Sequence, residues 1–323
     1  MSVRKTFACC LLLIGGMAGA HAQNYPTRNI TIISNYPPAG GVDIAGRIVG
    51  AELEKRLKQS VIVEDKPGAT GTIGAAAVAR AAPDGYTILV TANPAITLIP
   101  FMTKVDYDPV KDLIPIAKVA LAPTILVVPE DSPYKTFKEF VDASRDPNNK
   151  ILVGVPGVGA AGQIEFALLD NMVQSRIGTI PYRGATFIVN DVLAHQIAGG
   201  AAAVPAMAAQ IWAGKLRALT VVSARRSAIF PEVPTVQDAL GVRLDGFPTW
   251  YGFLVPAGTP PAIVSRLETE ILAIMKDPAI VEKMKSLGNE VLVTGSQAFA
   301  SENAIEIEEL KRAIKETNVS IPK

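Results

Sequence analysis

Three glycines with the spacing of a nucleotide-binding loop form the sharpest chemical pattern in the sequence. Gly157, Gly159 and Gly162 spell G-x-G-x-x-G between the apolar run KILV and a helix-like segment. A dinucleotide site also needs an acidic residue about 20 positions further on, where it binds the ribose. The chain has Tyr182 near that position, within IPYR. The pattern therefore predicts a strand, a glycine loop and a helix N-terminus, whose free N–H groups and dipole favour a carboxylate or another anion.

A second loop of the same kind lies nearer the N-terminus, in the segment SNYPPAGGVD. Two prolines end the preceding apolar run NITII, and Gly40 and Gly41 let a ligand approach the backbone closely. Asp43 follows where a helix is expected to begin, so an ordinary strand-to-helix turn with Asp43 as the N-cap is an equal alternative. The loop lacks the Gly-Lys-Ser/Thr ending of a Walker loop, so phosphate is not the favoured ligand.

Tyr182 and Arg183 follow a third apolar run, IGTI, in the segment PYRGA. The planar guanidinium of Arg183 suits a carboxylate, and Tyr182 offers a flat face with a polar tip. Taken alone, the segment is better explained as an exposed surface turn. Because ligands of open α/β sheets bind beyond the carboxyl ends of the strands, we expect the three loops to converge on one site.

Side chains for catalysis are scarce. His195 is the only histidine after position 22, and a single histidine on a helix-like segment is usually structural. The sequence contains no G-x-S-x-G elbow and no H-E-x-x-H pair. A hydrolase with two carboxylates leaves no short motif, so that class stays open. Trp250 and Tyr251 suit either the core or the wall of a cleft beside a chain crossing.

The first 22 residues predict a cleavable secretory signal peptide. Arg4 and Lys5 precede an apolar run that ends in Ala20-His21-Ala22, so we expect cleavage after Ala22 and a periplasmic protein. The apolar run is shorter than the ~20 residues that span a membrane, so we do not expect a membrane-embedded protein. Removing Arg4 and Lys5 from the 31 basic residues leaves 29 against 30 acidic residues, a balance that gives no electrostatic reason to expect nucleic-acid binding.

Both cysteines of the sequence, Cys9 and Cys10, lie in the predicted signal peptide. The mature chain would then contain no cysteine. This excludes a disulfide scaffold, thiol catalysis and cysteine-based zinc sites, so the fold must depend on its own hydrophobic core.

Short apolar runs alternate with longer amphipathic segments from Ile30 onward. The runs include YTILVTA, PTILVVP, KILVGVP and LRALTVVS, and the segments include GQIEFALLDNMV, PAIVSRLETEILAIMK and FASENAIEIEELKRAIKET. This alternation predicts an α/β protein, and continuous apolar runs are typical of parallel strands buried on both faces. The length indicates two domains, and the lack of a long Gly/Ser linker favours short crossings and hinge motion.

With these segments assembled, the chain resembles the Bug family, the extracytoplasmic solute-binding receptors of tripartite tricarboxylate transporters. The likeness covers almost the whole chain after position 22, with its markers in the family's order. They are YPTRNITII, the glycine loop with Asp43 and Arg47, VEDKPGATGTIGAAAVARAAPDGYTILV, VDYDPVKDLIPIAKV, the Gly157/Gly159 loop, IPYRGA, AGKLRALTVVSARR, FPEVPTV and WYGFLVPAGTP.

The resemblance implies a two-lobed fold like that of type II periplasmic binding proteins, with mostly parallel sheets and two interdomain crossings. In such receptors one loop from each lobe holds the ligand's carboxylate through backbone N–H groups and ordered water. No cofactor or metal ion is implied. The residues and the resemblance together predict a ligand-binding set of Asn35, Tyr36, Ala39, Gly40, Gly41, Val42, Asp43, Pro156, Gly157, Val158, Gly159, Ala160, Ala161, Gln163, Tyr182, Arg183 and Trp250.

Several positions depart from the family pattern. Ala39 replaces a frequent glycine, and Val155, Ala160 and Gln163 stand where the family usually has Ser, Ser or Thr, and His. A lost donor to a buried carboxylate costs about 1.5–3 kcal/mol if nothing replaces it. Arg183, where the family often has Lys, is a possible replacement. The alanine-rich segment GGAAAVPAMAAQ then indicates a roomier, less polar wall that suits a longer aliphatic or aromatic acid.

The sequence thus predicts residues 24–123 with 250–323 as one lobe and 124–249 as the other, with crossings at Ala122-Pro123-Thr124 and Pro248-Thr249-Trp250. We expect a non-enzymatic receptor that captures a small organic carboxylate by hinge closure and delivers it to membrane permease subunits. One alternative is a ligand-loaded partner of a membrane sensor, which would share the fold and the cleft. The other is an exported α/β hydrolase, which would depend on His195.

Overall fold

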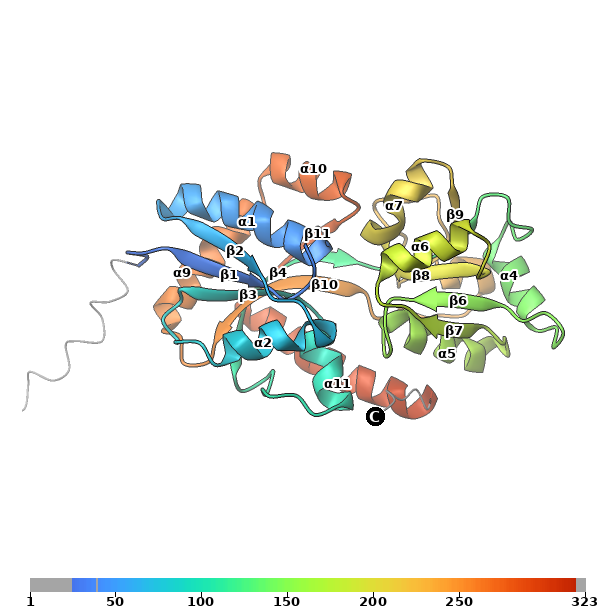
Figure 1. Cartoon of the computed structure of the whole chain (residues 1–323), viewed down its shortest axis with the longest axis horizontal. Coiled ribbons are helices and arrows are strands. Elements are labelled where there is room, and N and C mark those ends of the chain that lie inside the picture. The colour runs from blue at the N-terminus through green and yellow to red at the C-terminus, as the bar shows by residue number, and fades with distance from the viewer. Residues whose placement is uncertain (1–24, 39, 318–323) are drawn as a thin grey trace, which may run out of the picture.

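The computed structural model describes residues 25–38 and 40–317, which form two α/β lobes side by side (Figure 1). The predicted signal peptide and Ala39 lie outside the described residues. Lobe 1 is built on a six-stranded sheet in the order β11-β4-β10-β3-β1-β2, and lobe 2 on a five-stranded sheet in the order β7-β6-β8-β5-β9. The strands are β1 (Ile30–Ser34), β2 (Val61–Asp65), β3 (Thr87–Ala92), β4 (Leu113–Ala122), β5 (Thr124–Pro129), β6 (Leu152–Val155), β7 (Gly178–Pro181), β8 (Gly199–Ala203), β9 (Leu216–Val222), β10 (Thr249–Pro256) and β11 (Glu290–Gly295).

Helices cover both faces of each sheet. Those of lobe 1 are α1 (Gly41–Leu57), α2 (Thr72–Ala79), α3 (Ile99–Met102), α9 (Pro261–Ile274), α10 (Pro278–Ser286) and α11 (Ser296–Thr317), with a 3-10 turn at Ala69–Gly71 and a π-helical turn at Pro94–Leu98. Those of lobe 2 are α4 (Phe137–Ser144), α5 (Ala161–Val173), α6 (Ala185–Leu193), α7 (Val204–Trp212) and α8 (Val236–Leu240). None of the described helices is long and apolar enough to cross a membrane.

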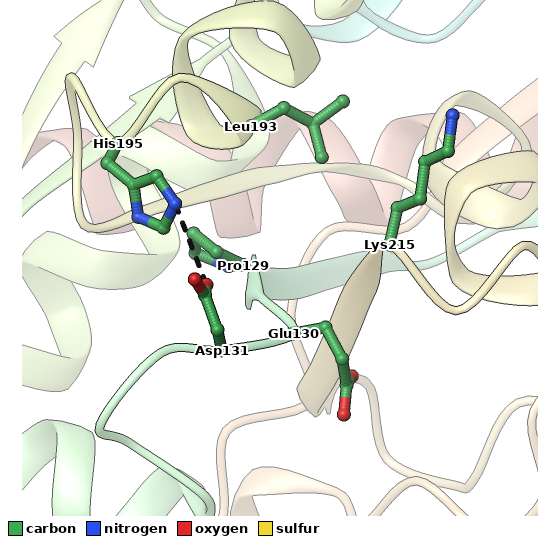
Figure 2. Close-up of a pocket in the computed structure, with 6 residues that line it drawn as sticks. All are labelled: Pro129, Glu130, Asp131, Leu193, His195 and Lys215. Atoms are coloured by element: carbon green, nitrogen blue, oxygen red, sulfur yellow. Dashed lines mark ion pairs between the residues drawn. The ribbon is translucent and has the colours of Figure 1, made fainter.

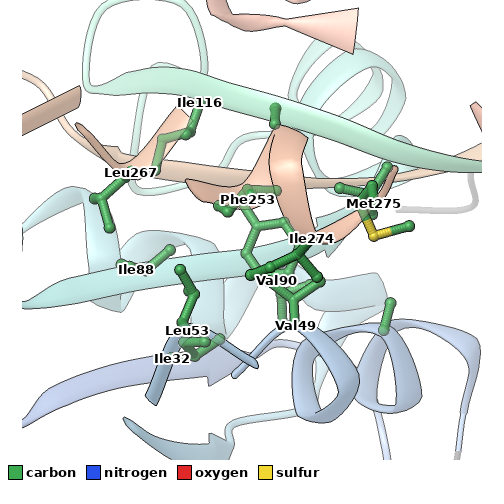
Figure 3. Close-up of a cluster of buried hydrophobic side chains, with 14 of the residues drawn as sticks. Ile32, Val49, Leu53, Ile88, Val90, Ile116, Phe253, Leu267, Ile274 and Met275 are labelled. Atoms are coloured by element: carbon green, nitrogen blue, oxygen red, sulfur yellow. The ribbon is translucent and has the colours of Figure 1, made fainter. Parts of the chain in front are cut away.

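The largest core cluster lies in lobe 1 between the sheet and helices α1 and α9 (Figure 3). Leu53 of α1 and Leu267 of α9 are fully buried against Ile32, Ile88 and Phe253 of the strands. A second cluster on the opposite face joins the sheet to α2 and α11. Because apolar side chains are buried on both faces, the strands of lobe 1 are closely packed between helices.

The two-lobed α/β fold predicted from the sequence is confirmed, but the expectation of mostly parallel sheets is wrong. Of the nine strand pairs in the described residues, β1–β2, β1–β3, β6–β7 and β6–β8 are parallel. The other five pairs, which involve β4, β5 and β10, are antiparallel. Helices cover both faces of these strands as well, and β5 is buried along its whole length. A continuous apolar run therefore reports burial and not strand direction.

The chain passes between the lobes near Pro123 and again before Thr249. Strands of the six-stranded sheet come from residues 30–122 and 249–295, and those of the five-stranded sheet from residues 124–222. We keep 24–123 with 250–323, and 124–249, as proposed lobe boundaries.

Helix α11 starts in lobe 1 and continues onto lobe 2 (Figure 1). Phe299 is buried under the six-stranded sheet, whereas Leu310 and Ala313 pack with Ile164 of α5. The lobes are therefore joined by a packed helix in addition to the two crossings.

Candidate ligand-binding site

The register of lobe 1 brings the loop after β1 to the edge next to lobe 2. Ser34, the last residue of β1, pairs with Val90 near the end of β3, and Ala92 of β3 pairs with Tyr251. Tyr251 lies near the start of β10, just after the chain has returned from lobe 2. The carboxyl ends of β1 and β3 therefore lie at the interlobe edge.

The register of lobe 2 brings the loops after β6 and β7 to the edge next to lobe 1. Val155, at the end of β6, pairs with Pro181 at the end of β7. The end of β8, Ala203, pairs with Thr124, the residue at which the chain enters lobe 2. The structure thus places all three predicted loops at interlobe edges, and Figure 1 shows the two edges turned toward each other.

The polar side chains that begin the first loop are engaged within lobe 1. Asn35 is fully buried, and its Nδ2 donates to the carbonyl of Gly71 at 2.8 Å and to Thr91 Oγ1 at 2.9 Å. The hydroxyl of Tyr36 donates to the Thr70 carbonyl at 3.2 Å. Asn35 and Tyr36 therefore hold the loop in position.

Helix α1 begins at Gly41, with Gly40 as its N-cap and no described side chain capping it. The alternative in which Asp43 is the N-cap is wrong, because Asp43 is the third residue of the helix. Asp43 is 2% exposed, and its Oδ1 lies 2.7 Å from Arg47 Nε. Val42 is buried in the core, so it offers a ligand only its backbone.

The second loop, residues 156–160, depends on its glycines for its shape. Gly157 and Gly159 have φ values of 123° and 73°, a region that favours glycine. The N–H of Gly159 donates to Gln163 Oε1 at 2.7 Å, so Gln163 closes the loop from the first turn of α5.

Helix α5 then begins at Ala161, and no side chain in the described residues caps it. Of the loop's other predicted residues, Pro156 is exposed and Val158 and Ala160 are half-buried. This loop, like the first, therefore ends in an uncapped helix N-terminus at the interlobe edge.

The third loop contributes one free cation. Tyr182 donates its hydroxyl to Asp191 Oδ2 at 2.7 Å, and partial burial with this carboxylate neighbour raises the pKa of Tyr182 to about 12. Arg183 is exposed and makes no hydrogen bond or ion pair with any described residue. Arg183 is therefore available to an anion, whereas the Tyr182 hydroxyl is already bonded.

Trp250 belongs to the core and not to the wall of a cleft. It is 1% exposed, its Nε1 donates to Glu306 Oε2 at 2.8 Å, and its ring meets that of Phe299 edge-on, with 4.8 Å between centroids. The core alternative is confirmed for this residue. Tyr251 points to the opposite face of the sheet, toward α1, where its hydroxyl lies next to Gly41.

Two hollows elsewhere on the surface lie at the far end of lobe 2. They have volumes of about 350 and 280 Å³, and both include Pro129 and His195 in their walls. Figure 2 shows the first hollow, where His195 Nε2 lies 3.6 Å from Asp131 Oδ1. Pro129 pairs with Leu216, at the opposite end of the sheet from Thr124. The predicted binding residues line neither hollow, so these hollows are separate from the candidate site.

His195 is more exposed than a structural core histidine would be. Its side chain is 59% exposed, and its φ is 55° in the turn after α6. Within residues 25–38 and 40–317, no group of three or more His, Cys, Asp or Glu side chains is placed to hold a metal ion.

Known proteins share both the sequence and the fold. Residues 45–319 match the family described as the tripartite tricarboxylate transporter family receptor. The chain is 34% identical to the UPF0065 protein in the tcbD-tcbE intergenic region of Pseudomonas sp. (strain P51), over 82% of this chain and 79% of the relative.

Two solved structures also superpose on most of this chain. The periplasmic binding protein BugD is 29% identical, with a TM-score of 0.80 over 92% of this chain and 99% of BugD. The R. palustris protein Rpa4515 with adipate is 25% identical, with a TM-score of 0.84 over the same shares of the two chains. The chain therefore belongs to the receptor family of tripartite tricarboxylate transporters, which includes the Bug proteins.

Proposed function

We propose that this protein is a periplasmic receptor that binds a small organic acid between its two lobes and delivers it to the permease subunits of a tripartite transporter. One observation carries the proposal: α1 and α5, from opposite lobes, both begin at the interlobe edges without a capping side chain from the described residues. The first N–H groups of a helix have no partner within the helix, so they are available to a ligand.

The charge at these helix ends favours an anion. An α-helix carries about half a positive elementary charge at its N-terminus, and a carboxylate there is a common ligand. Arg183, exposed and without an ion-pair partner among the described residues, adds a full positive charge beside α5. We assign the ligand carboxylate to the N–H groups at the starts of α1 and α5, with Arg183 as its cationic neighbour.

The body of the acid is proposed to be a longer aliphatic or aromatic chain. Ala160 and Ala161 offer no side-chain donor, and the neighbouring strand β8 ends in three alanines. Such a wall provides space and apolar surface instead of hydrogen bonds. The structure of Rpa4515 with adipate supports this choice, because adipate is a carboxylate with an aliphatic body.

Capture is proposed to occur by hinge closure. The ligand contacts both helix ends only when the lobes approach each other, so it binds the closed form more tightly than the open form. This difference in affinity stabilises the closed form. The donors are backbone groups at rigid helix ends, so little conformational entropy is lost when they engage the acid.

Thermal unfolding with a panel of mono-, di- and aromatic carboxylates tests this function. The protein is first unfolded and refolded to remove any co-purified ligand. A ligand at 100 times its dissociation constant adds about 2.7 kcal/mol to the free energy of unfolding, so a true ligand raises the melting temperature by several degrees. If no acid of the panel changes the melting curve, the proposed function is wrong.

Arg183→Ala tests the placement of the ligand, with Arg176→Ala as the matched control. Arg176 precedes β7 and Arg183 follows it, and both are exposed. Loss of a charge-assisted hydrogen bond is expected to weaken binding of the best acid about tenfold in Arg183→Ala and to leave it unchanged in Arg176→Ala. Equal affinities by calorimetry would remove Arg183 from the site.

A further inference from the structure

Tyr251 lies at the interlobe edge of lobe 1, directly beneath the start of α1. It is the third residue of β10 and pairs with Ala92 and Ala120 near the ends of β3 and β4. Successive strand residues face opposite sides of a sheet, so Tyr251 points toward α1 while Trp250 points toward α11.

The hydroxyl of Tyr251 contacts the first residue of α1. A Cβ atom placed on Gly41 would lie 2.2 Å from Tyr251 Oη and 2.6 Å from its Cζ. The backbone of Gly41 is helical, so its conformation does not require glycine. Gly41 instead leaves the space that the tyrosine hydroxyl occupies at the uncapped helix N-terminus.

This hydroxyl has no hydrogen-bond partner in the described residues, although the Tyr251 residue is only 5% exposed. The other tyrosines buried to a similar degree are bonded: Tyr25 donates to the Gly85 carbonyl at 2.6 Å and Tyr107 to the Ala95 carbonyl. The Tyr251 oxygen is not one of the fully enclosed polar atoms that lack a partner in the described residues, so it can be reached from outside the chain. A ligand at the N-terminus of α1 can therefore accept its hydrogen bond.

The Tyr251 hydroxyl is a donor at neutral pH, as any tyrosine hydroxyl is, and burial raises its pKa further. A neutral phenol beside uncapped backbone N–H groups forms a set of donors, and such a set suits a carboxylate.

We propose that the Tyr251 hydroxyl donates a hydrogen bond to the ligand carboxylate held at the N-terminus of α1, with Gly41 as the residue that makes room for it. The proposal rests on the proposed function, since it assigns a further contact in the same site. It adds a side-chain donor from β10 to a site otherwise made of loop and helix backbone.

Tyr251→Phe, compared with Tyr25→Phe, tests this inference. Tyr25 donates its hydroxyl to Gly85, which precedes β3 at the opposite end of the strand from Ala92. Titration calorimetry with the tightest acid of the panel is expected to show about 10- to 100-fold weaker binding by Tyr251→Phe and unchanged binding by Tyr25→Phe.

Without ligand, Tyr25→Phe is expected to be less stable than the unaltered protein, and Tyr251→Phe is expected to be equally stable. Tyr251→Phe removes no hydrogen bond among residues 25–38 and 40–317, so its melting temperature should match that of the unaltered protein, whereas Tyr25→Phe should melt lower. Equal acid affinity in Tyr251→Phe and the unaltered protein overturns the inference and leaves the proposed function standing. If the unaltered protein binds no acid, the proposed function fails and the inference fails with it.

Discussion

Glu165 is a fully buried carboxyl group beside the second chain crossing. Its Oε1 accepts the N–H of Phe247 at 2.7 Å, and it lies in lobe 2 on the helix that begins at the candidate site. Burial raises the pKa of Glu165 to about 7, although the Phe247 amide and the Thr124 hydroxyl act in the opposite direction. Near neutral pH this residue therefore exists in both protonation states.

Glu165 should make the protein less stable as the pH rises. The folded chain keeps the Glu165 proton up to a pKa of about 7, whereas the unfolded chain loses it near the ordinary value of 4.5. Between these pH values the folded state binds more protons than the unfolded state. The free energy of unfolding therefore falls by up to about 3 kcal/mol as the pH rises from about 4.5 to about 7, and the contribution of Glu165 is constant above that range. Glu165→Gln is expected to remove this dependence, as measured by denaturant unfolding at pH 5 and pH 8.

The exposed Glu309 provides the control, because Glu309→Gln should leave the pH dependence of stability unchanged. A Glu165→Gln protein that loses as much stability between pH 5 and pH 8 as the unaltered protein would show that other groups cause the loss.

At the scale of single residues, the sequence predicted where the loops lie, but it did not predict which hydrogen bonds their side chains form. Gly157 and Gly159 have the conformations expected of a glycine loop, and Arg183 is free for a ligand. Asn35 and Gln163, in contrast, bond to their own lobe. The type of a residue shows which hydrogen bonds its side chain can form. The partner in each bond depends on which residues the fold brings close, such as Thr91 beside Asn35.

At the scale of elements, α11 braces the two lobes. In its middle, Glu306 accepts hydrogen bonds from Asn93, Thr97 and Trp250 of lobe 1. Further along, Leu310 is 2% exposed and packs with Ile164 of lobe 2. The helix therefore connects the core of one lobe to α5 of the other, the helix at whose N-terminus the ligand is proposed to bind.

Leu310→Ala should lower the stability of the whole protein. Removal of a buried leucine side chain costs about 2–5 kcal/mol, through lost burial and the cavity that remains. Leu287→Ala is the control, because Leu287 is 36% exposed and should change the free energy of unfolding by less than about 1 kcal/mol. Urea unfolding measures both. A loss in Leu310→Ala no larger than in the control would mean that α11 does not contribute to the stability of the lobe contact.

Strongly patterned helices were predictable, whereas elements without a pattern of their own were not. The expected helices GQIEFALLDNMV and PAIVSRLETEILAIMK correspond to α5 and α9. Strand β8, with the sequence GGAAA, has none of the β-branched residues that mark a strand. It forms because β5 and β6 pair with it on either side. The role of α11 as a brace is a long-range contact that no local pattern encodes.

At the scale of the whole molecule, the lobe contacts gather on one side of the candidate site. Besides α11, Glu290 of β11 accepts from Ser227 Oγ at 2.6 Å and from the Ala228 N–H at 2.9 Å. Glu290 pairs with Leu121, two residues before the crossing at Pro123. In the sheet of lobe 1, β11 and β4 lie on the opposite side of β10 from β1. The lobes are therefore expected to rotate about these contacts while the loops after β1 and β6 approach each other.

The two-lobed form was predictable from the alternation of apolar runs with amphipathic segments and from the resemblance to a receptor family. The direction of the strands was not, because β5 and β10 are covered on both faces whichever way they run. Strand direction depends on the path of the chain between the lobes.

A crystal structure of the protein with its tightest-binding acid tests the central claim most directly. We expect closed lobes, with carboxylate oxygens about 3 Å from backbone N–H groups in the first turns of α1 and α5 and from the Tyr251 hydroxyl. An acid bound to one lobe alone, or in the hollow lined by His195 and Lys215, would contradict the account.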